Sequence, residues 1–217
     1  MKEIFENVFS KGGSIYTKNL TPGKSVYGER LIVEDGIEYR EWNPFRSKLG
    51  GAIKKGLSEM PIKKGSDVLY LGASTGTTVS HVSDIVEGGS VYSVEISQKM
   101  MQKLLELAEL RENIIPILAD ARKPHEYEEI GKVNVIYQDV AQPDQDRILM
   151  INADMFLQGG GYAMLCIKSQ SIDVTKKPKE VFEEVKKNLS SMFEVVQSIN
   201  LEPYDKEHEF VLLRKVK

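Results

Sequence analysis

The chain has 217 residues, of which 41% are hydrophobic and 28% charged, and its net charge at pH 7 is −3. This composition is ordinary for a globular protein with one sizeable core and a small additional unit. No apolar run approaches the roughly 18 residues of a membrane-spanning helix, and the amino terminus lacks a signal-peptide core, so we expect a cytoplasmic protein. One cysteine and three histidines exclude an internal disulfide and show no metal cluster, so we expect no metal.

The charge is uneven along the chain. Residues 1–60 contain ten Lys and Arg against eight Asp and Glu, a net of +2 that leaves −5 for the remainder. A basic cluster between Arg46 and Lys55 belongs to this part. Because the whole chain is negative, we do not expect it to grip nucleic acid over a broad surface by itself. The cluster is either a solvated helix face or a place that holds a short RNA segment.

Residues 1–42 alternate apolar and polar positions and predict a small antiparallel β unit. The pair Asp35-Gly36 between two such runs indicates a hairpin with a type I′ turn. Apolar spacing then predicts a helix over residues 45–60, although its glycines weaken it. We therefore expect a small β domain with a connecting helix over residues 1–60 and a second domain over residues 61–217.

The stretch from Asp67 to His81 predicts a strand, a tight turn and a helix. A short apolar run leads into Gly72 and Gly76, and Thr77 and Thr78 open the helix. In an open α/β sheet such a turn lies at the carboxyl end of a strand, where ligands bind near the free N–H groups of the helix. The glycines let the backbone approach a small molecule, and the threonines add hydroxyl donors.

From this turn onward, strands alternate with helices. We expect strands at 68–71, 91–95, 114–118, 133–137, 162–167, 193–199 and 209–216, and helices at 77–86, 98–110, 145–157 and 178–189. This alternation implies a mostly parallel sheet with right-handed crossovers. The last connection is too short for a helical crossover, so the last two strands should form an antiparallel hairpin. Such an α/β sheet is typical of Rossmann-like methyltransferases that use S-adenosylmethionine.

Three carboxylates follow successive strands of the predicted sheet. Glu95 ends a strand about twenty residues beyond the glycine turn, where α/β folds hold a ribose diol. Asp120 and Asp139 follow the next two strands, and Gln142 is nearby. The turn from Gly72 to Gly76 lacks the middle glycine that a pyrophosphate requires, and carboxylates suit a cationic sulfonium better than a pyrophosphate. S-adenosylmethionine is therefore the expected cofactor, although any single aspartate has a helix cap as its alternative interpretation.

Four segments resemble fibrillarin, in order and over nearly the whole chain. They are Glu41–Leu49, Val68–Asp84, Asp139–Gln145 and Glu202–His208. The chain resembles the archaeal form, because the glycine- and arginine-rich leader of eukaryotic fibrillarins is absent. The departures are small: Tyr137-Gln138 before Asp139, and Asp205-Lys-Glu where Glu-Arg-Asp is more usual. Neither departure removes a functional group of the family.

The resemblance implies methylation of the ribose 2′-hydroxyl in ribosomal and transfer RNA, directed by a box C/D guide RNA. It also implies a Nop-domain scaffold protein and a kink-turn-binding ribosomal-type protein as partners. The implied catalytic residues are Lys48, Asp139, Lys168 and His208. The expected cofactor-binding residues are Gly72, Ala73, Ser74, Thr77, Thr78, Glu95, Ile96, Asp120, Ala121, Asp139, Val140, Ala141 and Gln142.

These residue types suit the implied chemistry. A ribose hydroxyl is a poor nucleophile, so methyl transfer needs in-line positioning and removal of a proton. A lysine amine acts as a base only after losing its own proton, which a neighbouring cation favours. Lys48 beside Lys168 supplies that cation in this interpretation, while Asp139 and His208 orient the amines. His81, in contrast, is expected to be a helix residue without a chemical role.

Two other functions remain open at this point. One keeps the fold and the cofactor but methylates a protein, for example a glutamine side chain, which resembles an activity attributed to eukaryotic relatives. The other is a non-catalytic subunit that binds the cofactor to stabilise a ribonucleoprotein. The four implied catalytic residues argue against the second alternative, because a scaffold does not need them. The target nucleotides and the oligomeric state do not follow from the sequence.

Overall fold

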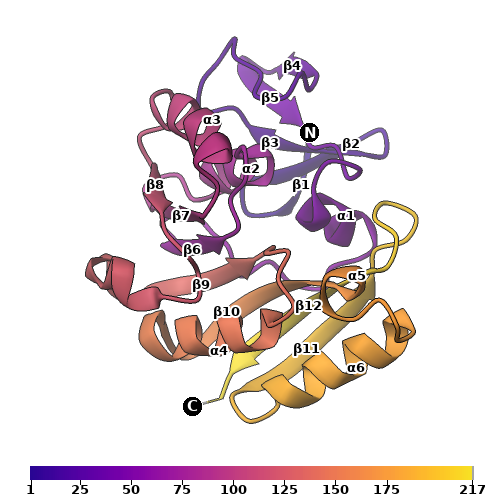
Figure 1. Ribbon diagram of the computed structural model, residues 1–217. Coiled ribbons are helices and arrows are strands. Elements are labelled where there is room, and N and C mark those ends of the chain that lie inside the picture. Colours follow the sequence, from indigo (N-terminus) through magenta and orange to yellow (C-terminus); the bar gives the residue numbers. More distant parts are fainter. Residues whose placement is uncertain (217) are drawn as a thin grey trace.

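The computed structural model describes residues 1–216 and opens with an antiparallel five-stranded sheet. The strand order is β1-β2-β3-β5-β4 (Figure 1). Asp35 and Gly36 between β4 and β5 have φ angles of 53° and 78°, which confirms the predicted type I′ hairpin. The strands are β1 Lys2–Phe5, β2 Val8–Lys11, β3 Ser14–Lys18, β4 Leu31–Glu34 and β5 Ile37–Glu41.

A second sheet of seven strands has the order β11-β12-β10-β9-β6-β7-β8. Its strands are β6 Val68–Leu71, β7 Val91–Glu95, β8 Ile114–Leu118, β9 Val133–Gln138, β10 Leu157–Lys168, β11 Phe193–Asn200 and β12 His208–Lys215. Strand β12 runs antiparallel to both β10 and β11. The other neighbouring pairs, β10 with β9, β9 with β6, β6 with β7 and β7 with β8, are parallel. The structure therefore confirms the predicted α/β sheet with an antiparallel last strand, preceded by an antiparallel β unit.

Helices cover both faces of the seven-stranded sheet (Figure 1). Within β6, Val68 and Tyr70 pack into the core shared with α1, α2 and α3, whereas Leu69 and Leu71 pack into the core under α4 and α6. Successive strand residues point to opposite faces, so a continuous apolar run supplies both cores. No helix of residues 1–216 is long and apolar enough to cross a membrane. The helices are α1 Lys48–Lys54, α2 Thr77–Ile85, α3 Gln98–Ala108, 3₁₀ helix η1 Pro124–Ile130, α4 Gln145–Phe156, α5 Ser169–Ile172 and α6 Pro178–Leu189.

Helix α1 is shorter than the helix predicted over residues 45–60, and that prediction was wrong in extent. The Ser47 side chain accepts the N–H of Gly50 and caps the helix, so α1 begins at Lys48. Gly56 has a φ of 91° and ends the helical turn. The cap matters for the site, because it fixes the backbone of the first helical residue.

A buried charged cluster joins the N-terminal unit to α2. Asp84 on α2 lies 2.8 Å from Arg40 of β5 and 2.5 Å from Arg111, and Arg40 lies 2.6 Å from Glu29. These side chains are almost completely shielded from water. Buried charges are tolerated only when they are paired and hydrogen-bonded, as they are here. The five-stranded sheet is thus held against the seven-stranded one at a defined position.

Candidate active site

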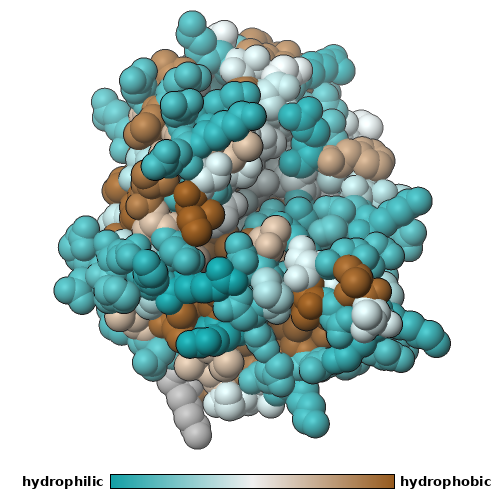
Figure 2. All heavy atoms as spheres, viewed as in Figure 1, coloured by the Kyte–Doolittle hydropathy of each residue, from teal (hydrophilic) through white to brown (hydrophobic). Residues whose placement is uncertain are grey.

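A cavity lies at the carboxyl ends of four neighbouring parallel strands, where open α/β sheets bind ligands. Gly72 follows β6, Glu95 ends β7, Asp120 follows β8 and Asp139 follows β9. The structure therefore brings the three predicted carboxylates into one cavity. In the space-filling view the front of the molecule is hollowed near its centre, between the parts that hold α3 and α4 (Figure 2). The remaining lining residues are Ser74, Val94, Ile96, Met100, Ala119, Ala121, Val140, Ala141, Gln142, Ile148 and Lys168.

Main-chain hydrogen bonds hold the Glu95 carboxylate in place. Its Oε2 accepts the N–H of Ser74 at 2.7 Å, and its Oε1 accepts the N–H of Ser97 at 2.8 Å. The residue is only 8% exposed. Each carboxylate oxygen keeps a further acceptor site, so Glu95 presents a fixed pair of acceptors to the cavity. Two vicinal hydroxyls of a ribose match such a pair.

Gly72 allows the ends of β6 and β9 to approach closely. Its φ is 84°, and a Cβ added there would lie 2.9 Å from the main-chain oxygen of Asp139. Any side chain would therefore push the two strand ends apart, in addition to straining the backbone. The glycine predicted from the turn is required by the geometry of the cavity wall.

Most of the predicted cofactor-binding residues line the cavity, but Ala73, Thr77 and Thr78 do not. Ala73 is buried at 4% exposure. Thr77 and Thr78 are the first two residues of α2, and neither lines this cavity. Thr77 lines a separate hollow, and Thr78 donates a hydrogen bond to the Ser47 hydroxyl at 3.0 Å. A cofactor contact by these three residues stays a prediction.

Asp139 forms ion pairs with two lysines. Lys168 at the end of β10 has its Nζ 2.8 Å from Asp139 Oδ1, and it donates a hydrogen bond to the Asp139 carbonyl oxygen at 2.8 Å. Lys48 at the start of α1 has its Nζ 3.2 Å from the same Oδ1 and donates to Oδ2 at 3.3 Å. Both amines therefore lie close together, as the sequence interpretation required.

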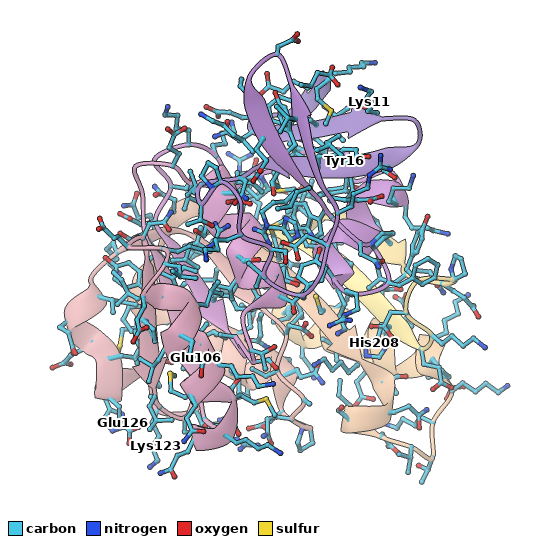
Figure 3. The ribbon with its side chains drawn as sticks, turned by 90° about the horizontal axis from the view of Figure 1, so that it is seen from above. Lys11, Tyr16, Glu106, Lys123, Glu126 and His208 are labelled. Atoms are coloured by element: carbon cyan, nitrogen blue, oxygen red, sulfur yellow. The ribbon has the colours of Figure 1, made fainter. Side chains whose placement is uncertain are left out.

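His208 joins this group through Asp205. His208 Nδ1 lies 2.9 Å from Asp205 Oδ1, and Lys48 Nζ lies 3.4 Å from Asp205 Oδ2. His208, labelled in Figure 3, begins β12, and its partner in the strand register is Lys168 of β10. The four predicted catalytic residues thus lie in one cluster. Sequence reasoning did not identify Asp205 as a member, and the available signal was its position three residues before His208.

Sequence reasoning also missed part of the cavity wall. Met100 lies in the first turn of α3, shortly after Glu95, and Ile148 lies in the first turn of α4. Their positions in the cavity wall could have been expected, because the helices of such a sheet begin beside its ligand site. Their apolar side chains give the cavity a surface on which a flat aromatic base can pack.

The charges around Lys48 keep it protonated. Burial by itself lowers the pKa of Lys48, but the carboxylates of Asp139 and Asp205 outweigh burial and hold the pKa above its ordinary value of 10.5. Burial likewise raises the pKa of Asp205, yet the hydrogen bond from His208 and the charge of Lys48 bring it below its ordinary 3.8. Lys48 is therefore a permanent cation at neutral pH, and Asp205 is a permanent anion.

This sheet order, with its glycine turn and acidic strand ends, defines a protein of the Rossmann-like methyltransferase class. The fibrillarin family model matches residues 1–217. The chain belongs to the fibrillarin family. A fibrillarin-like rRNA/tRNA 2′-O-methyltransferase from Pyrococcus abyssi is 54% identical over 203 residues, which are 93% of this chain and 89% of that protein.

Solved structures agree with this family. The Methanococcus jannaschii fibrillarin pre-rRNA processing protein has a TM-score of 0.95 and 51% identity, covering 99% of this chain and 96% of that one. Aeropyrum pernix fibrillarin with natively bound S-adenosyl-L-methionine has a TM-score of 0.86 and 46% identity, covering 92% and 88%. A fibrillarin in complex with Nop5p has a TM-score of 0.91 and 45% identity, covering 99% and 100%.

Proposed function

We propose that the chain transfers a methyl group from S-adenosylmethionine to ribose 2′-hydroxyls of ribosomal and transfer RNA, as the catalytic subunit of a box C/D guide ribonucleoprotein. The observation that carries this proposal is the position of Asp139. It lines the cofactor cavity, and its carboxylate also contacts both Lys48 and Lys168. The groups for the cofactor and for the acceptor therefore meet at one residue. The names of the archaeal relatives support the same activity.

The cavity residues fit S-adenosylmethionine. Glu95 offers its fixed acceptor pair to the ribose hydroxyls, and Asp120 offers acceptors to the polar edge of adenine. Ala121 and Val140 supply apolar contact for the base, and the carboxylate of Asp139 favours a positively charged ligand group. When bound, this cofactor supplies an electrophilic methyl group carried on a sulfonium.

The two lysines divide the acceptor chemistry between them. Lys168 Nζ accepts the proton of the 2′-hydroxyl, and its backbone is held by the Gln145 side chain, whose Oε1 accepts the Lys168 N–H at 3.1 Å. Lys48 remains a cation beside it and supplies positive charge where the 2′-hydroxyl loses its proton. Asp139 orients both amines, and His208 with Asp205 holds Lys48 from the other side.

The partners of this chain are part of the proposal. A related fibrillarin forms a complex with Nop5p, and we infer that a Nop-domain scaffold binds this chain too. With a net charge of −3 the chain offers few cations to an RNA backbone. We therefore propose that a kink-turn-binding protein and a guide RNA supply affinity and register by raising the local concentration of the target ribose. The cytoplasmic location stays a prediction.

Methyl transfer from tritiated S-adenosylmethionine tests this function. We expect the particle reconstituted with scaffold, kink-turn binder and guide to label one ribose of a matching RNA, and the isolated chain to label almost none. Lys168→Ala should abolish transfer with nearly unchanged cofactor affinity, whereas Lys187→Ala, on the exposed side of α6, should behave like the wild type.

The alternatives give other outcomes in the same assay. Label in a protein glutamine and none in RNA supports protein methylation. Cofactor binding without any transfer supports a structural subunit. Site-specific methylation of a guide-free oligonucleotide by the isolated chain, at a comparable rate, contradicts recognition by the particle.

A further inference from the structure

Lys168 is the last residue of β10, and main-chain pairing with β9 ends before it. The parallel register of the two strands closes at Leu165, opposite Gln138. The chain then turns at Asp139 toward α4, so β9 does not extend far enough to reach Lys168. On the other side, Lys168 pairs with His208 of β12. Because main-chain N–H and C=O groups require partners, the backbone of Lys168 needs a substitute on the side that β9 leaves.

The side-chain amide of Gln145 is that substitute. Its Oε1 accepts the Lys168 N–H at 3.1 Å, and its Nε2 donates to the Lys168 carbonyl oxygen at 3.4 Å. Gln145 is the first residue of α4, which packs against β9 and β10 (Figure 1), and it is completely buried. One amide thus provides the donor and the acceptor that a neighbouring strand would otherwise provide.

Gln138, the last residue of β9, holds Gln145 in turn. Its Nε2 donates to the Gln145 carbonyl oxygen at 2.7 Å. Gln138 is completely buried, and within residues 1–216 its Oε1 has no hydrogen-bond partner. An unpaired buried acceptor is costly, so stability by itself favours an apolar residue here. Gln138 also departs from the usual fibrillarin sequence before Asp139.

The two glutamines connect the strand end that carries Asp139 to the strand end that carries Lys168. Asp139 follows Gln138 directly, and its N–H donates to the Leu71 carbonyl oxygen at 2.9 Å. Lys168 Nζ lies 2.8 Å from Asp139 Oδ1 and donates to the Asp139 carbonyl oxygen at 2.8 Å. A lysine amine is carried on a flexible four-carbon stem, so its position depends on a backbone that does not move.

We propose that Gln145 and Gln138 are positioning residues for methyl transfer, because they hold the Lys168 backbone against the strand end that carries Asp139. The inference rests on the proposed function, in which the Lys168 amine takes the proton of the 2′-hydroxyl. Neither glutamine lines the cofactor cavity, so both act through Lys168 and not through the cofactor. Displacement of a reacting group by about 1 Å can slow an enzyme about a hundredfold. These residues should therefore set the rate of transfer without changing cofactor or RNA affinity.

Gln145→Met in the reconstituted particle tests this role. Methionine has a similar size but makes neither hydrogen bond, so we expect the single-turnover rate at saturating cofactor and RNA to fall about ten- to a hundredfold. Calorimetry should give unchanged affinity and stoichiometry for S-adenosylmethionine, and the RNA concentration at half-maximal rate should also stay the same. A general structural defect would instead lower the stoichiometry or the affinity.

Gln197→Met is the matched control. The Gln197 amide also bridges a main-chain N–H and a carbonyl oxygen, those of Ser58 at 2.8 Å and Gly56 at 3.0 Å. It does not line the cofactor cavity. Its removal should leave the transfer rate at that of the wild type, which shows whether loss of such a bridge matters only beside Lys168.

Gln138→Leu gives a second test that does not depend on the folding of Gln145→Met. Leucine removes the unpartnered acceptor together with the donor, so the fold should be retained. We expect the rate to fall about two- to tenfold, the order of one hydrogen bond. A wild-type rate in Gln138→Leu, or a loss explained by weaker cofactor binding in either variant, overturns the positioning role while the wild-type particle still methylates RNA. An inactive wild-type particle instead contradicts the proposed function itself.

Discussion

Single side chains decide the chemistry of this site, and Lys48 shows how. Its amine contacts Asp139 and Asp205, residues far from it in sequence and from each other. These two carboxylates hold its pKa above the ordinary range despite burial, so it carries its charge throughout any practical pH titration. The positive charge of Lys48 therefore acts on Lys168 as a constant electrostatic influence.

Lys48→Ala should slow transfer and raise the pH at which the rate is half maximal. Removal of the cation beside the acceptor makes loss of a proton at this site less favourable, so a higher pH is needed to reach the same rate. Lys48→Arg, which retains the charge, should leave the midpoint near that of the wild type. The measurement is a pH–rate profile under single-turnover conditions. A midpoint for Lys48→Ala that stays in place or moves down would exclude Lys168 as the base.

Glu95→Ala should weaken binding of S-adenosylmethionine about ten- to a hundredfold, since the lost ribose hydrogen bonds to a charged group are worth about 1.5 to 3 kcal/mol. The carboxylate also accepts the N–H groups of Ser74 and Ser97, so its removal loosens the glycine turn as well. Titration calorimetry measures the affinity. Glu112→Ala, at an exposed position before β8, is the control and should bind normally. Unchanged affinity in Glu95→Ala, or tight NAD binding by the wild type, contradicts the assignment.

At the scale of elements, the junction of β6 with β9 sets the shape of the cavity. Gly72 and Gly23 have nearly the same positive φ, 84° and 81°, but they differ in surroundings. A Cβ at Gly72 would meet the Asp139 backbone at 2.9 Å, whereas a Cβ at Gly23 has nothing within 4 Å. Alanine substitutions at these two glycines therefore distinguish the cost of backbone strain, which both share, from the cost of steric contact, which only Gly72 has.

Gly23→Ala should lower the free energy of unfolding by about 1 to 2 kcal/mol, the cost of a left-handed conformation. Gly72→Ala should lower it by about 1 to 3 kcal/mol more, because the strand ends must also move apart. Urea denaturation measures both values. Cofactor affinity should fall only in Gly72→Ala. Equal losses in both variants would show that the close approach of β6 and β9 is not energetically important.

At the scale of the whole molecule, His81 links the N-terminal unit to the seven-stranded sheet. The Thr17 hydroxyl donates to Asp84 at 2.7 Å, so it accepts from His81 Nδ1 at 2.7 Å. His81 Nε2 lies 2.8 Å from the Tyr27 hydroxyl, which also donates to the Glu41 carbonyl oxygen at 3.1 Å. Burial, followed by the charges of Arg40 and Arg111, holds the pKa of His81 well below its ordinary value of 6.5. His81 is a helix residue, as predicted, with a structural function in the interface.

The stability of the protein should therefore fall in mild acid. Below about pH 6.5 the unfolded chain binds a proton at His81, but the folded chain does not. The stabilisation of the folded state by neutral His81 is therefore complete above that pH and is lost progressively below it. The loss approaches about 1.4 kcal/mol per pH unit from this residue. Urea denaturation at pH values about one unit above and below 6.5 measures it. His81→Gln should show a smaller difference, and His125→Gln, at an exposed position, should keep that of the wild type.

If His81→Gln loses as much stability in acid as the wild type does, other groups are responsible. The carboxylates Asp84 and Glu29 of the same cluster are then the next residues to replace.

The order of the elements was predictable because it depends on local properties. Periodicity located the strands, Asp35-Gly36 specified its hairpin, and the short last connection required an antiparallel β12. Cys166, placed in an apolar run, is buried in β10. The division into domains at residues 60 and 61 stays a prediction, and the structure adds that the two units share the buried cluster around Asp84.

By itself, the sequence determined the fold class, the three carboxylates at strand ends and, through its resemblance to fibrillarin, the four candidate catalytic residues. Only the tertiary structure decided the extent of α1, the direction of Thr77 and Thr78, and the membership of Asp205 in the lysine cluster. The physical reason is that these features depend on contacts between distant segments. Lys48 and Asp139 are separated by 91 positions, and no local pattern encodes the 3.3 Å hydrogen bond that joins them.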